Sequence, residues 1–397
     1  MTAGPRPLDG VRVVDLTRLL PGGYATSLLV GLGAEVVKVE DPRGGDGLRV
    51  SPPYAASGES GLFLALCRGK RSVVLDLKAP GGREALLALV ASAQVLVDSF
   101  RPGVLDRLGL GADVLAAANP SLVHVSMTAY GEGSRAALPG HDLNVEGYAG
   151  LVGLVRGNDG QAALPSFPVA DMATGLQTAL AVVAGLRAVE RPGAVAAAPT
   201  SGPAFRADVT MLDSALSLNV IGQGTVMAAG TAPPVPDVLT GALACYGVYR
   251  CADGLELVLA ALEPKFFGRV AELVGDPSLA QVQYDIAGQD SLRGRLTTLF
   301  ASRPRHEWLD LLEDDDTCVS PVRGTDDALA DPDLRDRGVL EDVLLADGTA
   351  TSAARPVSWL PGTGEPTRAP ALGADTDDVL AALGLDVAAL RNQGALG

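Results

Sequence analysis

The chain has 397 residues, more than one ordinary domain needs, so its length predicts two domains. Hydrophobic residues make up 47% of the sequence, which is enough for a large core. Aspartate and glutamate number 47 against 31 lysines and arginines, and the net charge is -16. This acidity argues against non-specific binding to nucleic acid or to an anionic membrane, although a local group of basic residues can still hold an anionic ligand.

The N-terminal residues and the cysteines predict a reduced, cytoplasmic protein. The opening segment MTAGPRPLDG has no apolar signal region, and the longest apolar stretches are shorter than a membrane span. The four cysteines show neither a metal-ligand spacing such as CxxC nor the density of a disulfide framework; they are Cys67, Cys245, Cys251 and Cys318. No metal site is therefore expected.

The first 130 or so residues predict a doubly wound α/β sheet. Apolar runs typical of buried strands are VRVVDLT (11–17), EVVKVEDP (35–42), RSVVLDL (71–77), QVLVDSF (94–100) and SLVHVSM (121–127). Helical stretches lie between them, at YATSLLVGLGA (24–34), GGREALLALVASA (81–93) and VLDRLG (104–109). Strands that alternate with helices in this way form βαβ units with parallel strands, so this part is expected to be Rossmann-like.

The rest of the chain is more varied. After the loop EGSRAALPG (132–140), a long helix is expected just beyond Asp171, at MATGLQTALAVVAGLRAVE (172–190). The segment RPGAVAAAPTSGPA (191–204) is typical of a linker, and ADVTMLDSALSLNVIGQG (207–224) predicts a strand and a helix. An Asp-Gly turn inside GVYRCADGLELVLAAL (247–262) predicts a β-hairpin, and two helices follow it.

These elements predict a discontinuous large domain around a smaller one. We assign residues 1–200 to the N-terminal part of a Rossmann-like large domain, 201–225 to a linker, 226–325 to a small α+β domain, and 326–397 to a C-terminal part that returns to the large domain. A nicotinamide or flavin site on the first βαβ unit, with Glu40 or Asp41 as the ribose acid, is not favoured. The turn TRLLPGGYAT has no GxGxxG, and Pro21 stands where the pyrophosphate turn needs small residues.

Four separate blocks, in order, resemble one family. They are PLDGVRVVDLTRLLPGGYATSLLVGLGAEVVKVEDP, SFRPGVLDRLGLG, MTAYGEGSRAALPGHD and PVADMATG. Together they resemble the family III (CaiB/BaiF) CoA-transferases, from Pro7 to the tail ALGADTDDVLAALGL. The resemblance implies an interlocked homodimer with a Rossmann-like large domain and a smaller domain, acyl-CoA thioesters as ligands, and no cofactor apart from the coenzyme A of the substrate.

Within this family the histidine of Gly140-His141-Asp142 is similar to that of the 2-methylacyl-CoA racemases, where it is one of two catalytic bases. The transferases commonly carry tyrosine or phenylalanine there, and use an aspartate nucleophile at the position of Asp171. The segment LAALEPKFF resembles the racemase segment that supplies a glutamate, here Glu263. His141, Asp171 and Glu263 together predict a racemase. The alternatives are a CoA-transferase that forms an acyl-aspartyl anhydride on Asp171, and a non-catalytic acyl-CoA-binding protein.

The chemistry of inversion explains why these residue types are needed. One base removes the weakly acidic α-proton from one face while an acid returns a proton to the opposite face, and histidine suits both roles near neutral pH. An aspartate needs burial to raise its pKa, and a position at a helix start works against that. The enolate oxygen also needs donors, such as backbone N–H groups at a helix start or in the loop around Gly131 and Gly133.

Simpler roles compete with the catalytic ones. Asp171 can be an N-cap, His141 a turn residue with Asp142 as the N-cap of the next helix, and Glu263 a first-turn acid. His124 is expected to pack in the sheet and His306 to lie at the surface of a helix start; neither is placed in the site.

The resemblance also implies the residues that contact coenzyme A. They are Leu75, Asp76, Leu77, Lys78, Ser99, Phe100, Arg101, Arg107, Gly140, Asp142 and Asn144. Arg101 and Arg107 can pair with phosphate, or can be solvated loop charges. Three departures from the family pattern stand out: Asp41, where many relatives have a basic residue and where an acid repels phosphate; Phe167, in place of an asparagine; and Asp375, in place of a histidine.

Overall fold

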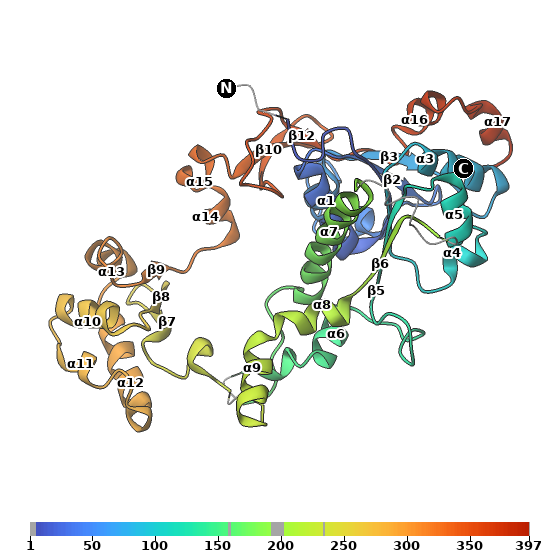
Figure 1. The fold of residues 1–397 in the computed structure, drawn as a ribbon. Helices are drawn as coiled ribbons and strands as arrows, with labels where there is room; N and C mark the ends of the chain where they lie inside the picture. The colour runs from blue at the N-terminus through green and yellow to red at the C-terminus, as the bar shows by residue number, and fades with distance from the viewer. Residues whose placement is uncertain (1–4, 158–159, 192–201, 233–234, 397) are drawn as a thin grey trace. The chain divides into compact units, whose positions relative to one another are not determined.

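The computed structural model describes residues 5–157, 160–191, 202–232 and 235–396 (Figure 1). The chain divides into two compact units. The first unit contains Met1–Leu151, Pro165–Asn219 and Leu329–Gly397, and the second contains Val152–Leu164 and Val220–Ala328. Each unit is described by itself.

A six-stranded parallel sheet forms the centre of the first unit, with the strand order β3-β2-β1-β4-β5-β6. The strands are β1 (Arg12–Leu16), β2 (Glu35–Glu40), β3 (Arg71–Val74), β4 (Val95–Asp98), β5 (Val123–Thr128) and β6 (Phe205–Thr210). This order is that of the doubly wound fold, and it reverses between β1 and β4. The prediction of a Rossmann-like α/β unit is confirmed.

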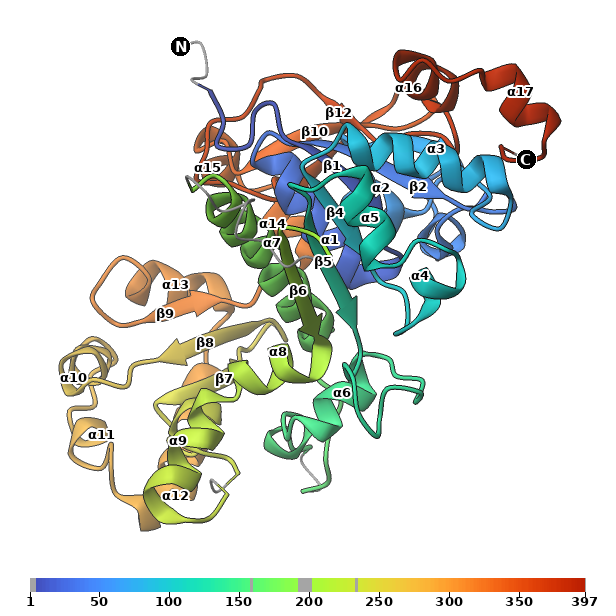
Figure 2. The same cartoon turned by 45° about the vertical axis from the view of Figure 1, so that its right-hand side comes forward.

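Helices cover both faces of this sheet. The helices of the first unit are α1 (Leu19–Gly31), α2 (Gly61–Cys67), α3 (Pro80–Ala91), α4 (Val104–Arg107), α5 (Ala112–Ala118), α6 (Asp142–Tyr148), α7 (Val169–Val189), α8 (Met211–Leu218), α15 (Pro332–Asp336), α16 (Thr376–Ala382) and α17 (Val387–Asn392). Alternate strand residues explain the two layers: Val13 faces the core that holds α1 and α7, whereas Val14 faces the core that holds α3, α5, α16 and α17. Figure 2 shows α3 and α5 on one side of the sheet and α1 and α7 on the other.

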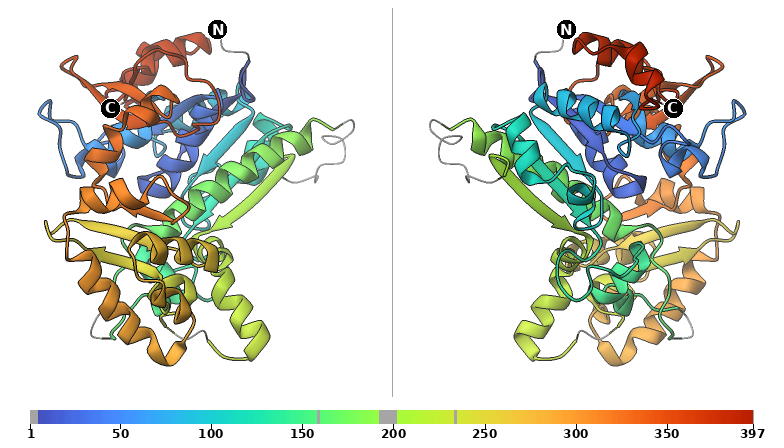
Figure 3. Two further views of the ribbon diagram at one scale, coloured as in Figure 1. Left: turned by 90° about the vertical axis from the view of Figure 1, so that its left-hand side faces the viewer. Right: turned by 90° about the vertical axis from the view of Figure 1, so that its right-hand side faces the viewer.

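Helix α7 is the longest in the first unit, and in Figure 3 it runs in green alongside β6. Among the described residues it is the helix with the length and hydropathy to cross a membrane. However, 56% of its most apolar stretch is buried, against α1 and the strands β5 and β6, as in a core helix.

The remaining strands of the first unit form a small sheet in the order β11-β10-β12. They are β10 (Leu340–Leu344), β11 (Ala350–Ala354) and β12 (Thr367–Arg368), with the 3-10 turn η1 (Gly47–Val50) elsewhere in the unit. The C-terminal helices α16 and α17 pack onto the large sheet through Leu380 and Leu390.

The second unit is a small α+β structure with its own core. Its antiparallel sheet has the order β7-β8-β9, and the predicted hairpin is confirmed by the pairing of β7 with β8. Its elements are η2 (Val152–Leu154), α9 (Val220–Ala229), η3 (Val238–Thr240), β7 (Tyr246–Arg250), β8 (Glu256–Ala260), α10 (Pro264–Leu273), α11 (Ser278–Gln281), η4 (Ile286–Gly288), α12 (Gln289–Phe300), α13 (Arg305–Leu312), β9 (Val319–Pro321) and α14 (Thr325–Leu329), which ends at the boundary. Phe300 and Trp308 stack edge to face in its core, with ring centroids 5.4 Å apart.

The structure corrects the predicted linker at 201–225. Residues of this segment form β6, an edge strand of the large sheet, then α8 and the start of α9. The predicted strand and helix at 207–224 are therefore present, and the second segment of the first unit ends at Asn219. The linker-like residues 192–201 lie outside the described residues.

Candidate active site

A cavity of about 730 Å³ opens in the first unit at the carboxyl ends of β1, β4, β5 and β6. In a doubly wound sheet this edge, where the strand order reverses, is the expected position of a ligand site. The cavity is lined by the segments that follow these strands, namely Arg18–Pro21, Ser99–Pro102 and Met127–Gly131, and by Met211. His141 and Asp171 also line it.

His141 is positioned as the N-cap residue of α6, at the end of the loop that leaves β5. Its backbone N–H donates to Oδ1 of Asn144 at 3.1 Å, which closes the first turn of the helix. The preceding Gly140 is required by packing, because a Cβ there would lie 2.6 Å from the Tyr130 hydroxyl oxygen. The alternative of Asp142 as the N-cap is wrong, since Asp142 is the first residue inside the helix.

Asp171 is the third residue of α7 and is buried, with 8% of its surface exposed. The alternative role as N-cap is also wrong, because Pro168 occupies that position. The backbone N–H of Asp171 donates to Oδ1 of Asp142 at 2.9 Å. Asp142 directly follows His141. This hydrogen bond therefore connects the start of α6, which carries His141, to the first turn of α7, which carries Asp171.

Burial, and then the charge of Asp142, raise the pKa of Asp171 to about 7. The first-turn N–H groups of α7 do not counteract this rise, because they serve other carboxyls. Val169 N–H donates to Oε1 of Glu146 at 3.0 Å, and Asp171 N–H donates to Asp142. A helix start therefore coexists here with a carboxyl that takes up a proton near neutral pH.

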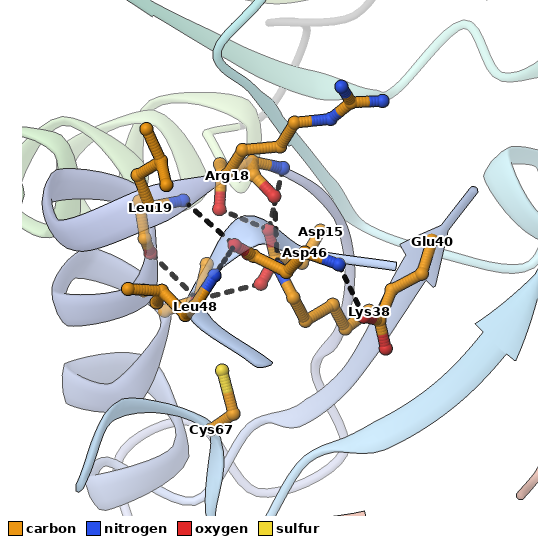
Figure 4. A network of polar contacts seen from close by, with 12 residues as sticks. Asp15, Arg18, Leu19, Lys38, Glu40, Asp46, Leu48 and Cys67 are labelled. Carbon is orange, nitrogen blue, oxygen red and sulfur yellow. Dashed lines mark hydrogen bonds and ion pairs between the residues drawn. The ribbon is translucent and has the colours of Figure 1, made fainter. Parts of the chain in front are cut away.

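The turn that carries Arg18 and Leu19 into the cavity wall is held by a buried ion pair (Figure 4). Leu19 has a φ of 62°, and its N–H donates to Oδ1 of Asp46 at 3.2 Å. The other Asp46 oxygen lies 2.8 Å from the Lys38 ammonium, which also donates to the carbonyl oxygen of Thr17 at 2.9 Å. Burial opposes the charge of Lys38, but the neighbouring carboxylates, chiefly Asp15, raise its pKa above the usual value.

A second buried lysine, Lys70, lies directly before β3 and supports the same turn by binding α1. The Lys70 ammonium donates to Oγ1 of Thr26 at 2.6 Å and lies 3.5 Å from Oδ2 of Asp15. The other oxygen of Asp15 accepts the N–H of Thr17 at 2.8 Å. The network thus fixes the first residues after β1.

A smaller cavity of about 180 Å³ adjoins the first, since Arg18 and Phe100 line both. It is also lined by Leu75, Asp76, Leu77 and Lys78, the segment predicted to hold the nucleotide of coenzyme A. Asp41 lies in the same wall, and Arg43 donates hydrogen bonds to its carboxylate from Nε and Nη2, each at 2.9 Å. These hydrogen bonds lower the pKa of Asp41 to about 2, and the guanidinium offsets the repulsion expected between Asp41 and a phosphate.

The sequence of the chain matches the sequence model of CoA-transferase family III over residues 8–376. The chain belongs to this family. It is 33% identical over 365 residues to a succinyl-CoA:mesaconate CoA-transferase of Haloarcula hispanica, covering 88% of this chain and 89% of that protein. It is 29% identical over 381 residues to the alpha-methylacyl-CoA racemase of Mus musculus, covering 94% of this chain and 92% of the racemase.

Solved structures of family III share the fold. A CaiB/BaiF family protein from Brucella suis superimposes with a TM-score of 0.79 at 26% identity, over 96% of this chain and all of that one (100%). Transferases and racemases occur among the relatives at similar identity, so family membership identifies an enzyme of this superfamily and leaves its reaction to the residues of the site.

Of the other residues predicted to contact coenzyme A, some line the larger cavity and some do not. Ser99, Phe100 and Arg101 line the larger cavity, and Ser99 Oγ also accepts the Arg18 N–H at 3.0 Å. Arg107 is exposed at the end of α4 and lines neither of the two cavities. Asp142 and Asn144 do not line the larger cavity; they hold Asp171 and His141 through the hydrogen bonds described above.

Glu263 lies in the second unit, as the exposed N-cap residue of α10 directly before Pro264. Its position is described within the second unit, and its interaction with His141 stays a prediction. The predictions for the other histidines are confirmed: His124 is buried in β5, with Nε2 at 2.8 Å from Asp98, and His306 is exposed in the first turn of α13.

Two further departures from the family pattern are Phe167 and Asp375. Phe167 is 60% exposed beside the start of α7. Asp375 accepts the Ser72 N–H at 2.8 Å and lies 3.3 Å from Arg71 Nε, so it anchors the C-terminal segment to β3. Gly131 N–H donates to Oγ1 of Thr128 at 2.9 Å, which makes it unavailable to an enolate oxygen.

Sequence reasoning missed Glu146, which is fully buried on α6. Its spacing of four residues from Asp142 places the two carboxyls on one helix face, and this was the available signal. Among the described residues, no three His, Cys, Asp or Glu side chains are grouped so as to hold a metal ion.

Proposed function

We propose that the protein is a racemase or epimerase that inverts the α-carbon of 2-methyl-branched acyl-CoA thioesters. The observation that carries the proposal is a single cavity lined by His141 and by an aspartic acid, Asp171, whose pKa is raised to about 7. Two groups that exchange protons near neutral pH are what a 1,1-proton transfer requires. No cofactor beyond the coenzyme A of the substrate is part of the proposal.

In one direction, neutral His141 removes the α-proton while protonated Asp171 donates a proton to the opposite face. In the other direction, the Asp171 carboxylate removes the proton and the His141 imidazolium returns one. The negative charge of the enolate passes to the thioester oxygen, which needs aimed donors.

The walls of the cavity favour an apolar acyl group. Its apolar lining includes Leu20, Leu48, Leu62, Met127, Leu138 and Met211. Among the described residues that line it, the cationic side chains are Arg18 and Arg101, and Arg18 also lines the smaller cavity beside Leu75–Lys78. A branched hydrocarbon chain suits these walls better than the second carboxylate of a dicarboxylic acyl group.

The CoA-transferase reaction is the second candidate, and the transferases among the relatives favour it. In that reaction the Asp171 carboxylate attacks the thioester carbonyl, forms an acyl-aspartyl anhydride and expels the thiolate of coenzyme A. A pKa of about 7 leaves much of Asp171 protonated near neutral pH, which serves a general acid better than a nucleophile.

We also propose that the protein works as a homodimer. Leu176, Leu180 and Val183 repeat along one face of α7 and are 52%, 62% and 39% exposed. An exposed apolar stripe on a core helix is typical of a protein interface. Sedimentation equilibrium is expected to give twice the chain mass, and a monomer at micromolar concentration contradicts this proposal. The cytoplasmic location stays a prediction from the sequence.

Isotope exchange tests the proposed reaction. A single epimer of a 2-methylacyl-CoA is incubated with the protein in D₂O, with and without a free carboxylic acid as acceptor. The racemase is expected to introduce deuterium at the α-carbon and to lose optical purity without the acceptor, and His141→Gln should slow both by about 10²–10⁴-fold. Transfer of coenzyme A to the acceptor without α-exchange overturns the proposal in favour of the transferase.

A further inference from the structure

Glu146 is an acid in an apolar environment. It is fully buried on α6, a helix whose neighbour Val145 packs in an apolar core with Ala170 and Met211. Figure 1 shows α6 beside α8, with the start of α7 nearby. A buried carboxyl is costly unless each oxygen has a partner. Oε1 accepts the Val169 N–H at 3.0 Å, whereas no donor from the described residues reaches Oε2.

A second acid lies close to Glu146. Asp142 stands one helical turn before it on the same face of α6, and two carboxyls so close can share a proton. Burial, and then this contact and the charge of Asp142, raise the pKa of Glu146 to about 7. The pair therefore holds one proton below neutral pH and loses it above.

Asp142 connects this pair to the cavity. Its Oδ1 accepts the Asp171 N–H at 2.9 Å, and its charge helps to raise the pKa of Asp171. When Glu146 is protonated, its O–H donates to Asp142 and only one negative charge lies behind Asp171. When Glu146 ionises, a second negative charge is added and makes the ionisation of Asp171 harder.

We propose that Glu146 is a positioning residue for Asp171: its buried carboxyl shares a proton with Asp142, and Asp171 keeps its own proton to higher pH because Glu146 ionises beside it. The inference rests on the proposed function, in which Asp171 is one of the two proton-transfer groups. Through Val169 and Asp171, the same two carboxyls also hold the first turn of α7. Glu146 touches no reacting atom in this scheme.

The groups that face Glu146 are few. Its own helix contributes Asp142. Asp171 belongs to the first turn of α7, whose Val169 N–H binds Glu146. From α8, Met211 and Ala215 pack against α6, while Asp213 in the first turn of α8 is exposed. The ionisation of Glu146 is opposed by burial and by the negative charge of Asp142, and it is favoured by hydrogen bonds from the N–H groups of Val169 and Ala170.

The test is Glu146→Gln, which keeps an oxygen for the Val169 N–H and offers Asp142 an N–H that cannot ionise. We expect the rate of α-proton exchange at pH 9 to fall about tenfold while the rate at pH 6 stays within about twofold, because the basic limb of the pH profile moves down by about one unit. Glu190→Gln, in the exposed pair with Arg187 at the opposite end of α7, is the control and should leave the profile unchanged. A Glu146→Gln profile that superimposes on that of the wild type overturns the proposal.

A direct titration separates this inference from the reaction itself. ¹³C NMR of protein labelled at the Asp and Glu carboxyls, with signals assigned from Asp171→Asn and Glu146→Gln, gives the midpoint of Asp171 in each protein. The midpoint is expected to be lower in Glu146→Gln, and an unchanged midpoint contradicts the inference. Should the wild type show no α-exchange, the proposed function fails, while this midpoint still decides the role of Glu146.

Discussion

Asp171 is expected to make the fold less stable at high pH. Its pKa is raised from 3.8 to about 7, a difference of about 3 units (7 − 3.8), and each unit corresponds to about 1.36 kcal/mol. A carboxyl whose pKa is raised by folding favours the folded state fully only below its unfolded pKa. That advantage is lost as the pH rises toward 7, and above pH 7 the folded protein carries the whole cost, about 4 kcal/mol.

Replacement of Asp171 by asparagine removes this cost, because the amide resembles the protonated acid and cannot ionise. We expect Asp171→Asn to raise the free energy of unfolding by about 4 kcal/mol at pH 8 and by about 2 kcal/mol at pH 5, while proton exchange is lost. Urea denaturation followed by circular dichroism, at one protein concentration, measures both values.

The matched control is Asp213→Asn. Asp213 is also the third residue of a helix, α8, but it is exposed. Its replacement should change the free energy of unfolding by less than about 0.5 kcal/mol at either pH. The reasoning is refuted if Asp171→Asn gives the same gain at both pH values or none at all, since Asp171 would then ionise freely and could not serve as an acid near pH 7.

Three further changes test other parts of the site. His141→Gln should lower the rate constant of proton exchange by about 10²–10⁴-fold with little change in KM, as steady-state kinetics will show. Lys38→Met should lower the free energy of unfolding by about 3–5 kcal/mol in urea, because it leaves the buried Asp46 without its cation. Arg43→Gln should weaken coenzyme A binding about tenfold in calorimetry, because the charge of Asp41 is then uncompensated; equal affinity would place the phosphates elsewhere.

The strands of the large sheet were predictable from the sequence, but the last of them, β6, was assigned to a linker. The valine-rich strands β1 to β5 are buried on both faces, and each stands out as a continuous apolar run. β6 lies at the edge, and its residues alternate between buried or half-buried and exposed positions. Its FRADVT sequence therefore carries polar residues, and the Ala- and Pro-rich segment before it is typical of a linker.

The site was predictable in its residues but only partly in its electrostatics. His141 and Asp171 were found through the Gly-His-Asp and Val-Ala-Asp blocks, and both line the cavity. Glu146 was missed because a glutamate on a short helix is normally exposed, whereas this one is buried and accepts the N–H of Val169 from a distant segment. The carboxyl that was expected to repel phosphate, Asp41, is neutralised by an arginine two residues later, which only the folded turn brings back onto it.

The last residues of the chain close the core of the first unit. Leu390, Ala395 and Leu396 are buried against α3, and the Asp76 N–H donates to the carbonyl oxygen of Ala395 at 2.8 Å. Without these residues, the apolar surface beside α3 that they cover is exposed to solvent. Loss of some twenty terminal residues would therefore expose the sheet below α3, a long way along the chain from His141, and leave the enzyme prone to aggregate.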